Sequence, residues 1–442
     1  MSAEESLSGT HVDLVDTSPD PVASPVHGLR RLIVTVAAGN LLEWYDFGIY
    51  GYFALVLSKQ FFPGGAALLL TFATFGVGFL ARPLGAVVFG HVGDRYGRRR
   101  ALFLSVLGMA GGTFLMGCLP NFAHIGYTAP VILTVLRLLQ GFSCGGEWAG
   151  SAAYMIETAP VNRRGFAGSW QEFSLVAALL VSSGVGALIN GTLSASEIAS
   201  WGWRVPFFAG ILIAVPALVL RFTAGETPLF ESLKAEDRVA TAPLKEIFTS
   251  TRIPMLKAAG FAMLFTVAFY VLLTYLSTWL VTAAGFSSTF GLVVVMIENA
   301  VLALLIPFTG AWSDRIGRKP LLLISCGLFA VLSYPMFLLM EHASAVGVIL
   351  LGVVFAIILS LFSGPGPSAL AELFPTRVRY TALSIPYQTV IAICGGFAPF
   401  IATLLIQWTH QASAPAWYLV LSAVVTFIAV ATFAETARKP LT

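Results

Sequence analysis

Charged side chains are scarce in this sequence. Lys, Arg, Asp and Glu make up 11% of its 442 residues, whereas hydrophobic residues make up 57%. Soluble domains carry about 25% charged residues, so this chain has too little polar surface to cover a fold of its size in water. The composition excludes an ordinary soluble protein and predicts one that lipid surrounds.

Cysteines and enzyme motifs are also few. Cys118, Cys144, Cys326 and Cys394 all fall in apolar stretches, and we interpret them as small core residues rather than disulfides or metal ligands. The six histidines are scattered, and His-Glu-x-x-His, Gly-x-Ser-x-Gly and phosphate-loop motifs are missing, so the sequence predicts neither a metal site nor an enzyme. The basic residues form no single patch, which argues against nucleic acid as a partner.

Long uncharged stretches are abundant instead. A helix crosses the hydrocarbon core in about 20 residues, and residues 101–120, 174–195 and 345–364 contain no charge. We expect an all-α integral membrane protein with twelve transmembrane helices. The expected spans are 31–57, 66–92, 101–120, 127–156, 166–190, 203–222, 256–284, 288–311, 320–340, 345–371, 381–407 and 415–435.

Lys and Arg fall mainly in alternate loops of this helix order. Cytoplasmic loops collect these residues, so the sequence predicts that both termini of this multi-pass protein lie in the cytoplasm. Residues 1–28 are polar and acidic and lack the apolar stretch of a signal peptide, and we expect them to form a disordered cytoplasmic tail.

A ten-residue motif occurs in two related copies, each after the second helix of one half of the chain. Gly90-His-Val-Gly-Asp94-Arg95-Tyr-Gly97-Arg98-Arg99 has its counterpart in Gly310-Ala-Trp-Ser-Asp314-Arg315-Ile-Gly317-Arg318-Lys319. Glu157, Pro160 and Arg164 are matched in the same way by Glu372, Pro375 and Arg379.

These repeats predict two parallel six-helix bundles. We place them at residues 29–222 and 256–436. A cytoplasmic linker loop, residues 223–255, would join them, and residues 437–442 would form a second cytoplasmic tail.

The repeated sequence resembles the loop signature of the major facilitator superfamily, and Arg137-Leu-Leu-Gln-Gly141-Phe-Ser-Cys-Gly145 resembles its fourth-helix motif. More narrowly, the chain resembles the metabolite:proton symporters, which include citrate, ketoglutarate, shikimate and proline/betaine carriers. This resemblance rests on Gly39-Asn40-Leu-Leu-Glu43-Trp44-Tyr45-Asp46-Phe47, Arg82-Pro83-Leu-Gly85, Gln140-Gly-Phe-Ser-Cys-Gly-Gly-Glu147, Trp201-Gly-Trp203-Arg204-Val-Pro206-Phe207 and Glu226-Thr-Pro228. It implies a carrier that the proton gradient drives without a cofactor.

Charged loop residues are candidates for a gate at the cytoplasmic end. Asp94 and Asp314 stand where one helix ends and the next begins, and a carboxylate there can accept hydrogen bonds from free N–H groups at the start of a helix in the other half. Ion pairs across the seam would add to this, although the same charges can serve only to fix the topology. The predicted gate consists of Gly90, Asp94, Arg95, Gly97, Arg99, Glu157, Arg164, Asp314, Arg315, Gly317, Arg318, Glu372 and Arg379.

Two acids of the first span are candidates for proton coupling. Ionisable groups in the membrane are costly and usually face a cavity. Asn40, Glu43, Asp46 and Tyr50 fall within an arc of about 120° on one helix, and Glu43 or Asp46 can bind a proton in a partly dry site. The alternative is a buried structural ion pair of either acid with Arg82 or Arg137.

Arg82 is the first candidate to anchor an anionic substrate group, because arginine matches a carboxylate with two hydrogen bonds. Arg137 can bind substrate or relay to the first span, and Arg204 can equally be an interfacial anchor or outer gate. The predicted substrate-binding set is Asn40, Tyr50, Arg82, Arg137, Gln140, Arg204, Tyr270, Tyr275, Glu298 and Gln388.

The sequence and the resemblance together predict proton-coupled uptake of a small carboxylate-bearing metabolite by alternating access. A proline/betaine-type osmolyte symporter is the main alternative, and an exporter or a transporter-like sensor are others. We expect a monomer in the bacterial inner membrane whose partners are the substrate, protons and lipid.

Overall fold

The computed structural model describes residues 40–96, 98–145, 148, 152, 155–156, 159–223, 252–374, 379–439 and 441. Over these residues the chain is helical, with short turns and no strand, as the predicted all-α class requires. The predicted tail 1–28 and nearly all of the predicted linker 223–255 lie outside the described residues. So do Gly97 and Glu157, together with the side chains of Asp94, Arg95 and Arg99 and the surroundings of Gly90.

The first half begins with a helix over residues 40–52, which breaks at Phe53 and continues as α2. The half then contains α2 (Ala54–Phe61), α3 (Ala67–Leu80), α4 (Arg82–Tyr96), α5 (Arg98–Cys118), α6 (Phe122–Ile125), α7 (Thr128–Cys144), α9 (Arg164–Thr192), α10 (Ala195–Ser200) and α11 (Val205–Thr223).

The second half contains α14 (Arg252–Tyr270), a π-helical turn η3 (Val271–Tyr275), α15 (Leu276–Thr282), α16 (Ser288–Ile316), α17 (Arg318–His342) and α18 (Ala345–Ser363). It ends with α19 (Gly366–Ala371), α20 (Arg379–Val390), a second π turn η4 (Ile391–Gly395), α21 (Ala398–Thr409) and α22 (Pro415–Ala431).

Seven helices of the described residues are long and apolar enough to cross a bilayer, and four shorter ones are similarly apolar. Each of the eleven overlaps one predicted span from 66–92 onward. The remaining predicted span, 31–57, starts outside the described residues and includes the helix 40–52.

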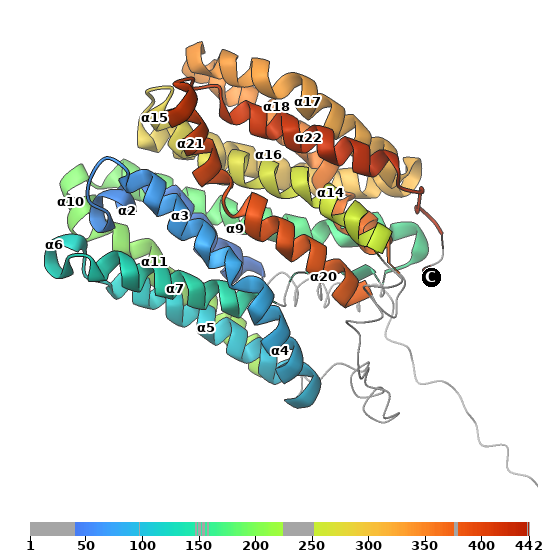
Figure 1. Ribbon diagram of the computed structural model, residues 1–442, viewed down its shortest axis with the longest axis horizontal. Helices are drawn as coiled ribbons and strands as arrows, with labels where there is room; N and C mark the ends of the chain where they lie inside the picture. Colours follow the sequence, from blue (N-terminus) through green and yellow to red (C-terminus); the bar gives the residue numbers. More distant parts are fainter. Residues whose placement is uncertain are drawn as a thin grey trace, which may run out of the picture.

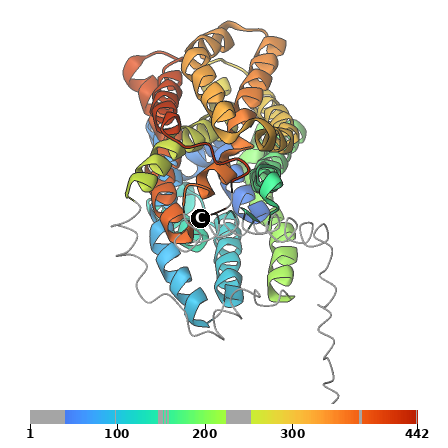
Figure 2. The same cartoon turned by 90° about the vertical axis from the view of Figure 1, so that its right-hand side faces the viewer.

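The two halves lie side by side, with the first half (blue to green) and the second half (yellow to red) forming opposite parts of the bundle (Figures 1 and 2). α9 and α16 run along each other at the centre and make the most extensive contact between halves. Small residues allow this approach: a Cβ on Gly310 would lie 2.6 Å from the carbonyl oxygen of Gly165. Close packing of this kind joins helices in lipid, where the hydrophobic effect does not.

Both π turns lie where the second half meets the first. Gly51 packs against Thr274 of η3. Gly396, at the end of η4, packs against Phe79 of α3. π turns are rare and are frequently found at functional sites, and these two flank the centre of the seam.

Candidate functional site

An ion pair between two helices of the first half lies at the centre of the bundle. Arg82, the first residue of α4, approaches Glu43 of the helix 40–52 with 2.9 Å between Nη2 and Oε1, and both side chains are at most 2% exposed. The Arg82 guanidinium also lies 4.7 Å from the ring centre of Phe47 and 4.4 Å from that of Phe79. The ion pair that the sequence left as an alternative is therefore present in this conformation.

A second buried network surrounds Asp46 one turn further along the same helix. Asp46 Oδ2 accepts hydrogen bonds from the Thr113 hydroxyl and from Gln140 Nε2, the latter at 3.2 Å. Gln140 in turn accepts a hydrogen bond from Arg137 Nη1 at 2.9 Å. Gln140 thus connects Arg137 to the acid of the first span, while Asp46 Oδ1 has no hydrogen-bond partner among the described residues.

Arg137 is fully buried and its charge is covered mainly by aromatic rings. Its guanidinium lies 4.6 Å from the ring centre of Phe47, 4.4 Å from Tyr50 and 5.1 Å from Phe75. A cation over an aromatic face gains about 0.5–2 kcal/mol, more when water is excluded. Phe47 therefore separates the two buried arginines and touches both.

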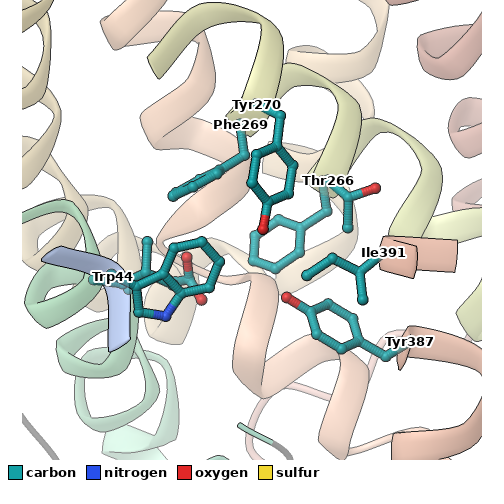
Figure 3. Close-up of a pocket in the computed structure, with 9 residues that line it drawn as sticks. Trp44, Thr266, Phe269, Tyr270, Tyr387 and Ile391 are labelled. Atoms are coloured by element: carbon teal, nitrogen blue, oxygen red, sulfur yellow. The ribbon is translucent and has the colours of Figure 1, made fainter. Parts of the chain in front are cut away.

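Beside Arg82 lies a small chamber between the halves, shown in Figure 3. In this conformation its cavity volume is about 10 Å³, room for about one water molecule, and aromatic side chains make up most of its lining. Its lining comprises Trp44, Glu172, Leu175, Phe265, Thr266, Phe269, Tyr270, Tyr387 and Ile391.

Aromatic side chains and one acid define the chemistry of the chamber. Figure 3 shows Trp44 from the first half facing Tyr270 and Tyr387 from the second. Trp148 stacks on Tyr387 with ring centres 3.9 Å apart and donates from Nε1 to Glu172 at 3.4 Å. The Arg82 guanidinium lies 5.8 Å from the Trp44 ring, so the chamber has a cation on one side and a carboxyl group in its wall.

The other predicted substrate residues surround the centre at different depths. Tyr270 lines the chamber, whereas the Tyr50 hydroxyl donates to the Thr71 carbonyl beneath Arg137. Asn40 donates to Ser174 of α9 at 3.0 Å. Gln388 donates to the Gly145 carbonyl across the seam at 3.5 Å, and the Tyr275 hydroxyl meets Thr403 of α21.

Arg204 and Glu298 do not reach the chamber. Arg204 donates to the carbonyls of Ser200 and Leu119 and lies 4.3 Å from the Trp203 ring, at the end of the bundle. This position agrees with the alternative of an interfacial anchor, and a role of Arg204 in substrate binding stays a prediction. Glu298 lies within α16, buried, and is not part of the chamber lining.

At one end of the bundle, Asp314 binds the first turn of a helix in the other half. Its two carboxylate oxygens accept hydrogen bonds from the N–H groups of Gly165 and Phe166, at 2.8 and 2.9 Å. Arg318 pairs with Asp314 at 2.8 Å and with Glu372 at 3.4 Å. We call this end the gate end.

Further hydrogen bonds cross the seam at the gate end. Ser368 donates to the Arg164 carbonyl, and Arg164 donates to the carbonyl of Lys439 in the C-terminal segment. Arg379 is buried and bonds within its own half, to the Ala371 carbonyl. Gly317 has a φ of 106°, a conformation that favours glycine, at the junction of α16 and α17, and Arg315 lines a cleft beside Asp314.

Sequence reasoning missed most of the chamber wall. Neither the predicted substrate-binding set nor the predicted gate includes Glu172, which lines the chamber. Phe265, Phe269 and Tyr387 are not in the predicted set either. The spacing of Phe261, Phe265 and Phe269 at every fourth residue was the available signal, because it places them on one helix face.

The arrangement is that of a membrane carrier, and comparisons with known proteins agree. The model of the family described as "Sugar (and other) transporter" matches residues 32–252 and 229–442. A glycine betaine/proline/ectoine/pipecolic acid transporter of Dickeya dadantii is 36% identical, over 93% of this chain and 85% of its own length. A citrate-proton symporter of Klebsiella pneumoniae is 33% identical, over 92% of this chain and 93% of its own.

Solved structures show the same fold. The xylose transporter XylE from E. coli in a partially occluded inward-open conformation has a TM-score of 0.75 at 18% identity, over 93% of this chain and 99% of that one. Its complex with 6-bromo-6-deoxy-D-glucose, titled as a proton:xylose symporter of the major facilitator superfamily, has a TM-score of 0.76 at 18% identity, over 94% and 98%.

The chain belongs to the sugar (and other) transporter family of the major facilitator superfamily. It is therefore a multi-pass membrane transporter and not an enzyme. The superfamily and the class of carrier predicted from the sequence motifs are both confirmed.

Proposed function

We propose that this protein is a proton-coupled symporter that takes up a small carboxylate carrying a cationic group, of the betaine or proline type. The observation that carries the proposal is the juxtaposition of Arg82 with an aromatic chamber whose wall holds Glu172. Arginine binds a carboxylate with paired hydrogen bonds, and aromatic faces bind quaternary ammonium groups. A zwitterion satisfies both ends of the site at once.

A citrate-like anion fits the site less well. Such a substrate offers several negative charges and no positive one, whereas the chamber wall offers a carboxyl group and electron-rich ring faces. Relatives named for proline/betaine and for citrate are about equally similar to this chain, so the chamber rather than the identity favours the zwitterion.

Asp46 and Glu43 are the proposed proton-coupling acids. Glu43 balances Arg82 while the substrate is absent, and a substrate carboxylate that takes over Arg82 would leave Glu43 to bind a proton. Asp46 has an oxygen without a hydrogen-bond partner in the described part of the chain, which is where a proton can bind. Linking substrate to proton in this way makes uptake follow the proton gradient.

The gate residues and the orientation remain part of the proposal. Asp314, Arg318 and Glu372 would hold the gate end closed and release it during alternating access. The loop sequence of residues 90–99, by its likeness to that of 310–319, would act in the same way. The distribution of Lys and Arg supports a cytoplasmic gate end in a bacterial inner membrane, with the protein working as a monomer.

Uptake by proteoliposomes under an imposed proton gradient tests the substrate class. Betaine and proline would be compared with citrate, ketoglutarate, succinate and shikimate. The matched control is 3,3-dimethylbutyrate, which has the shape and carboxylate of betaine without its positive charge. We expect betaine or proline to accumulate and 3,3-dimethylbutyrate to fail as a competitor. Accumulation of citrate without betaine or proline would refute the zwitterion.

A further inference from the structure

Glu298 is a carboxyl group that the proposed coupling site does not use. It lies about 15 Å along α16 from Ser288, at 1.5 Å per residue, which is half the thickness of a hydrocarbon core of about 30 Å. Its side chain is 1% exposed. Neither of its oxygens has a hydrogen-bond partner, and no ion pair within the described residues includes it.

Burial without a partner determines whether the Glu298 carboxyl group is ionised or neutral. An ionised carboxylate buried without a partner costs several kcal/mol or more, so the group binds a proton instead. Glu43 is equally buried but has Arg82 at 2.9 Å, which stabilises its ionised form. In the conformation that the structure shows, Glu298 is therefore a neutral acid.

Glu298 also lies beside a contact that joins the two halves. The Tyr52 hydroxyl, from the helix 40–52, donates to the Leu273 carbonyl of η3 at 2.5 Å and accepts from Asn299 Nδ2 at 3.1 Å. Asn299 follows Glu298 on α16, which places the carboxyl group one residue from a member of this contact. We call these contacts of Tyr52 with Leu273 and Asn299 the Tyr52 bridge.

Other charges are remote from this position. α15 and α18 carry no charged side chain, and those of α17 lie at its two ends. On α9, Gly184 packs beside Met296, and Glu172 is about three turns away. Tyr275 of η3 meets Thr403 of α21, so Tyr52 is the titratable group that these described elements place at the bridge.

We propose that Glu298 is a proton-binding site whose occupancy switches with the Tyr52 bridge. It holds a proton while the bridge is closed. When the helix 40–52 separates from α16 and η3, water reaches the carboxyl, the O–H bond breaks, the proton passes to water and the carboxylate keeps the electron pair. This inference goes beyond the coupling acids and rests on the proposed function only for the fate of that proton.

The proposal predicts a pH-dependent conformation. Rising pH favours the ionised acid, which only the open bridge can accommodate, so the closed population falls as pH rises. Glu298→Gln resembles the neutral acid at every pH and should remain closed. Glu298→Asp keeps an ionisable group and should therefore retain the fall of the closed population with rising pH.

The first experiment is infrared spectroscopy of the full chain in liposomes across a pH titration. We expect the carbonyl stretch of a protonated carboxylic acid at neutral pH in the wild type, with one such component missing in Glu298→Gln. Glu341→Gln, at the end of α17, is the matched control and should leave the component unchanged. An identical acid band in wild type and Glu298→Gln would overturn the proposal.

The second experiment measures distance across the seam. Spin labels at Asn190→Cys and Thr289→Cys, residues in hydrogen-bond contact here, would be introduced with Cys118 and Cys394 replaced. Once the acid titrates, we expect the ratio of open to closed populations to rise about tenfold per pH unit in the wild type and to stay flat in Glu298→Gln. An unchanged pH response in Glu298→Gln would contradict the switch.

The infrared and distance measurements do not depend on substrate transport. If uptake proved independent of the proton gradient, the proposed symport would fail while the infrared and distance results still decided the state of Glu298. If Glu298→Gln failed to insert, the Glu298→Asp and wild-type titrations would remain, and an absent acid band or a pH-independent distance in both would refute the proposal.

Discussion

The two halves of the bundle bury their ionisable groups in different ways. In the first half, Glu43 pairs with Arg82, and Gln140 connects Asp46 to Arg137. In the second half, Asp314 pairs with Arg318 at the gate end, but Glu298, within α16, has no partner in the described residues. Paired charges can stay ionised until a substrate competes for them, whereas an unpaired acid must change its charge when the protein moves.

The largest effect on uptake is expected from breaking the ion pair between Arg82 and Glu43. Arg82→Ala leaves the Glu43 carboxylate buried and uncompensated, at a cost of about 3–5 kcal/mol, and removes the proposed anchor. The lost anchor would have made two hydrogen bonds to the substrate carboxylate, each worth about 1.5–3 kcal/mol. We therefore expect substrate uptake to fall at least about 100-fold, as 1.4 kcal/mol is a factor of ten. Arg204→Ala, which changes a residue away from the chamber, should change uptake little.

Adding Glu43→Gln separates folding from transport in this variant. The double variant Arg82→Ala with Glu43→Gln should recover expression and thermal stability but not uptake. Recovery of normal uptake would show that Arg82 does not anchor the substrate.

Coupling is the next difference to test in the first half. Asp46→Asn removes an acid but keeps a group of the same shape, so substrate exchange should persist while proton-driven accumulation disappears. For a gradient of one pH unit and one proton, about tenfold accumulation would be lost. Counterflow and net uptake in the same proteoliposomes measure the two activities, and normal accumulation would exclude Asp46 as the coupling acid.

A substitution at the gate end should have an effect similar to or smaller than that of Asp46→Asn. Asp314→Asn weakens two charge-assisted hydrogen bonds to the first turn of α9, each worth about 1.5–3 kcal/mol. The population open at the gate end should rise by about tenfold or more, measured by maleimide labelling of Ser368→Cys, which is buried at the seam. Asp94→Asn would show whether the first copy of the motif contributes equally, and unchanged labelling in Asp314→Asn would argue for a purely topological role.

The aromatic wall should affect affinity and selectivity more modestly. Tyr387→Leu removes a ring face that stacks with Trp148, and a cation–π contact is worth about 0.5–2 kcal/mol. We expect the KM for betaine to rise about 2–30-fold, with Tyr387→Phe near the wild type. An equal loss of affinity for an uncharged competitor would indicate altered packing instead.

The smallest effect concerns the C-terminal segment. Burial raises the pKa of Glu435, but hydrogen bonds from the N–H groups of Ala437, Arg318, Lys319 and Thr436 outweigh it and hold the pKa of the carboxyl below its usual range. A lowered folded-state pKa means that this stabilisation exists at neutral pH and is lost as pH falls through that pKa.

Glu435→Gln should therefore destabilise the protein by about 0.3–1 kcal/mol at pH 7, the usual gain of an anion at a helix N-terminus. The difference from the wild type should shrink in acid. Thermal unfolding in detergent at pH 7 and at acidic pH measures the stability difference between the variant and the wild type. An equal difference at the two pH values would contradict a stabilising role of the ionised Glu435 carboxylate.

The sequence by itself determined the class of fold. Scarce charge and long apolar runs require a lipid environment, and the repeat of residues 90–99 at 310–319 required two related halves. It also identified Glu43, Asp46, Arg82 and Arg137, because ionisable groups in apolar helices stand out individually and their cost in lipid demands a partner or a cavity.

Only the tertiary structure decided how these groups combine. Arg82 meets Glu43 rather than Asp46, Arg204 lies away from the chamber, and Glu172 lines it beside rings from both halves. Residues far apart in the chain meet through helix packing, which depends on where small residues let helices approach and on local changes such as η3 and η4. Periodicity along one helix specifies a face, but the partner of that face depends on the whole bundle.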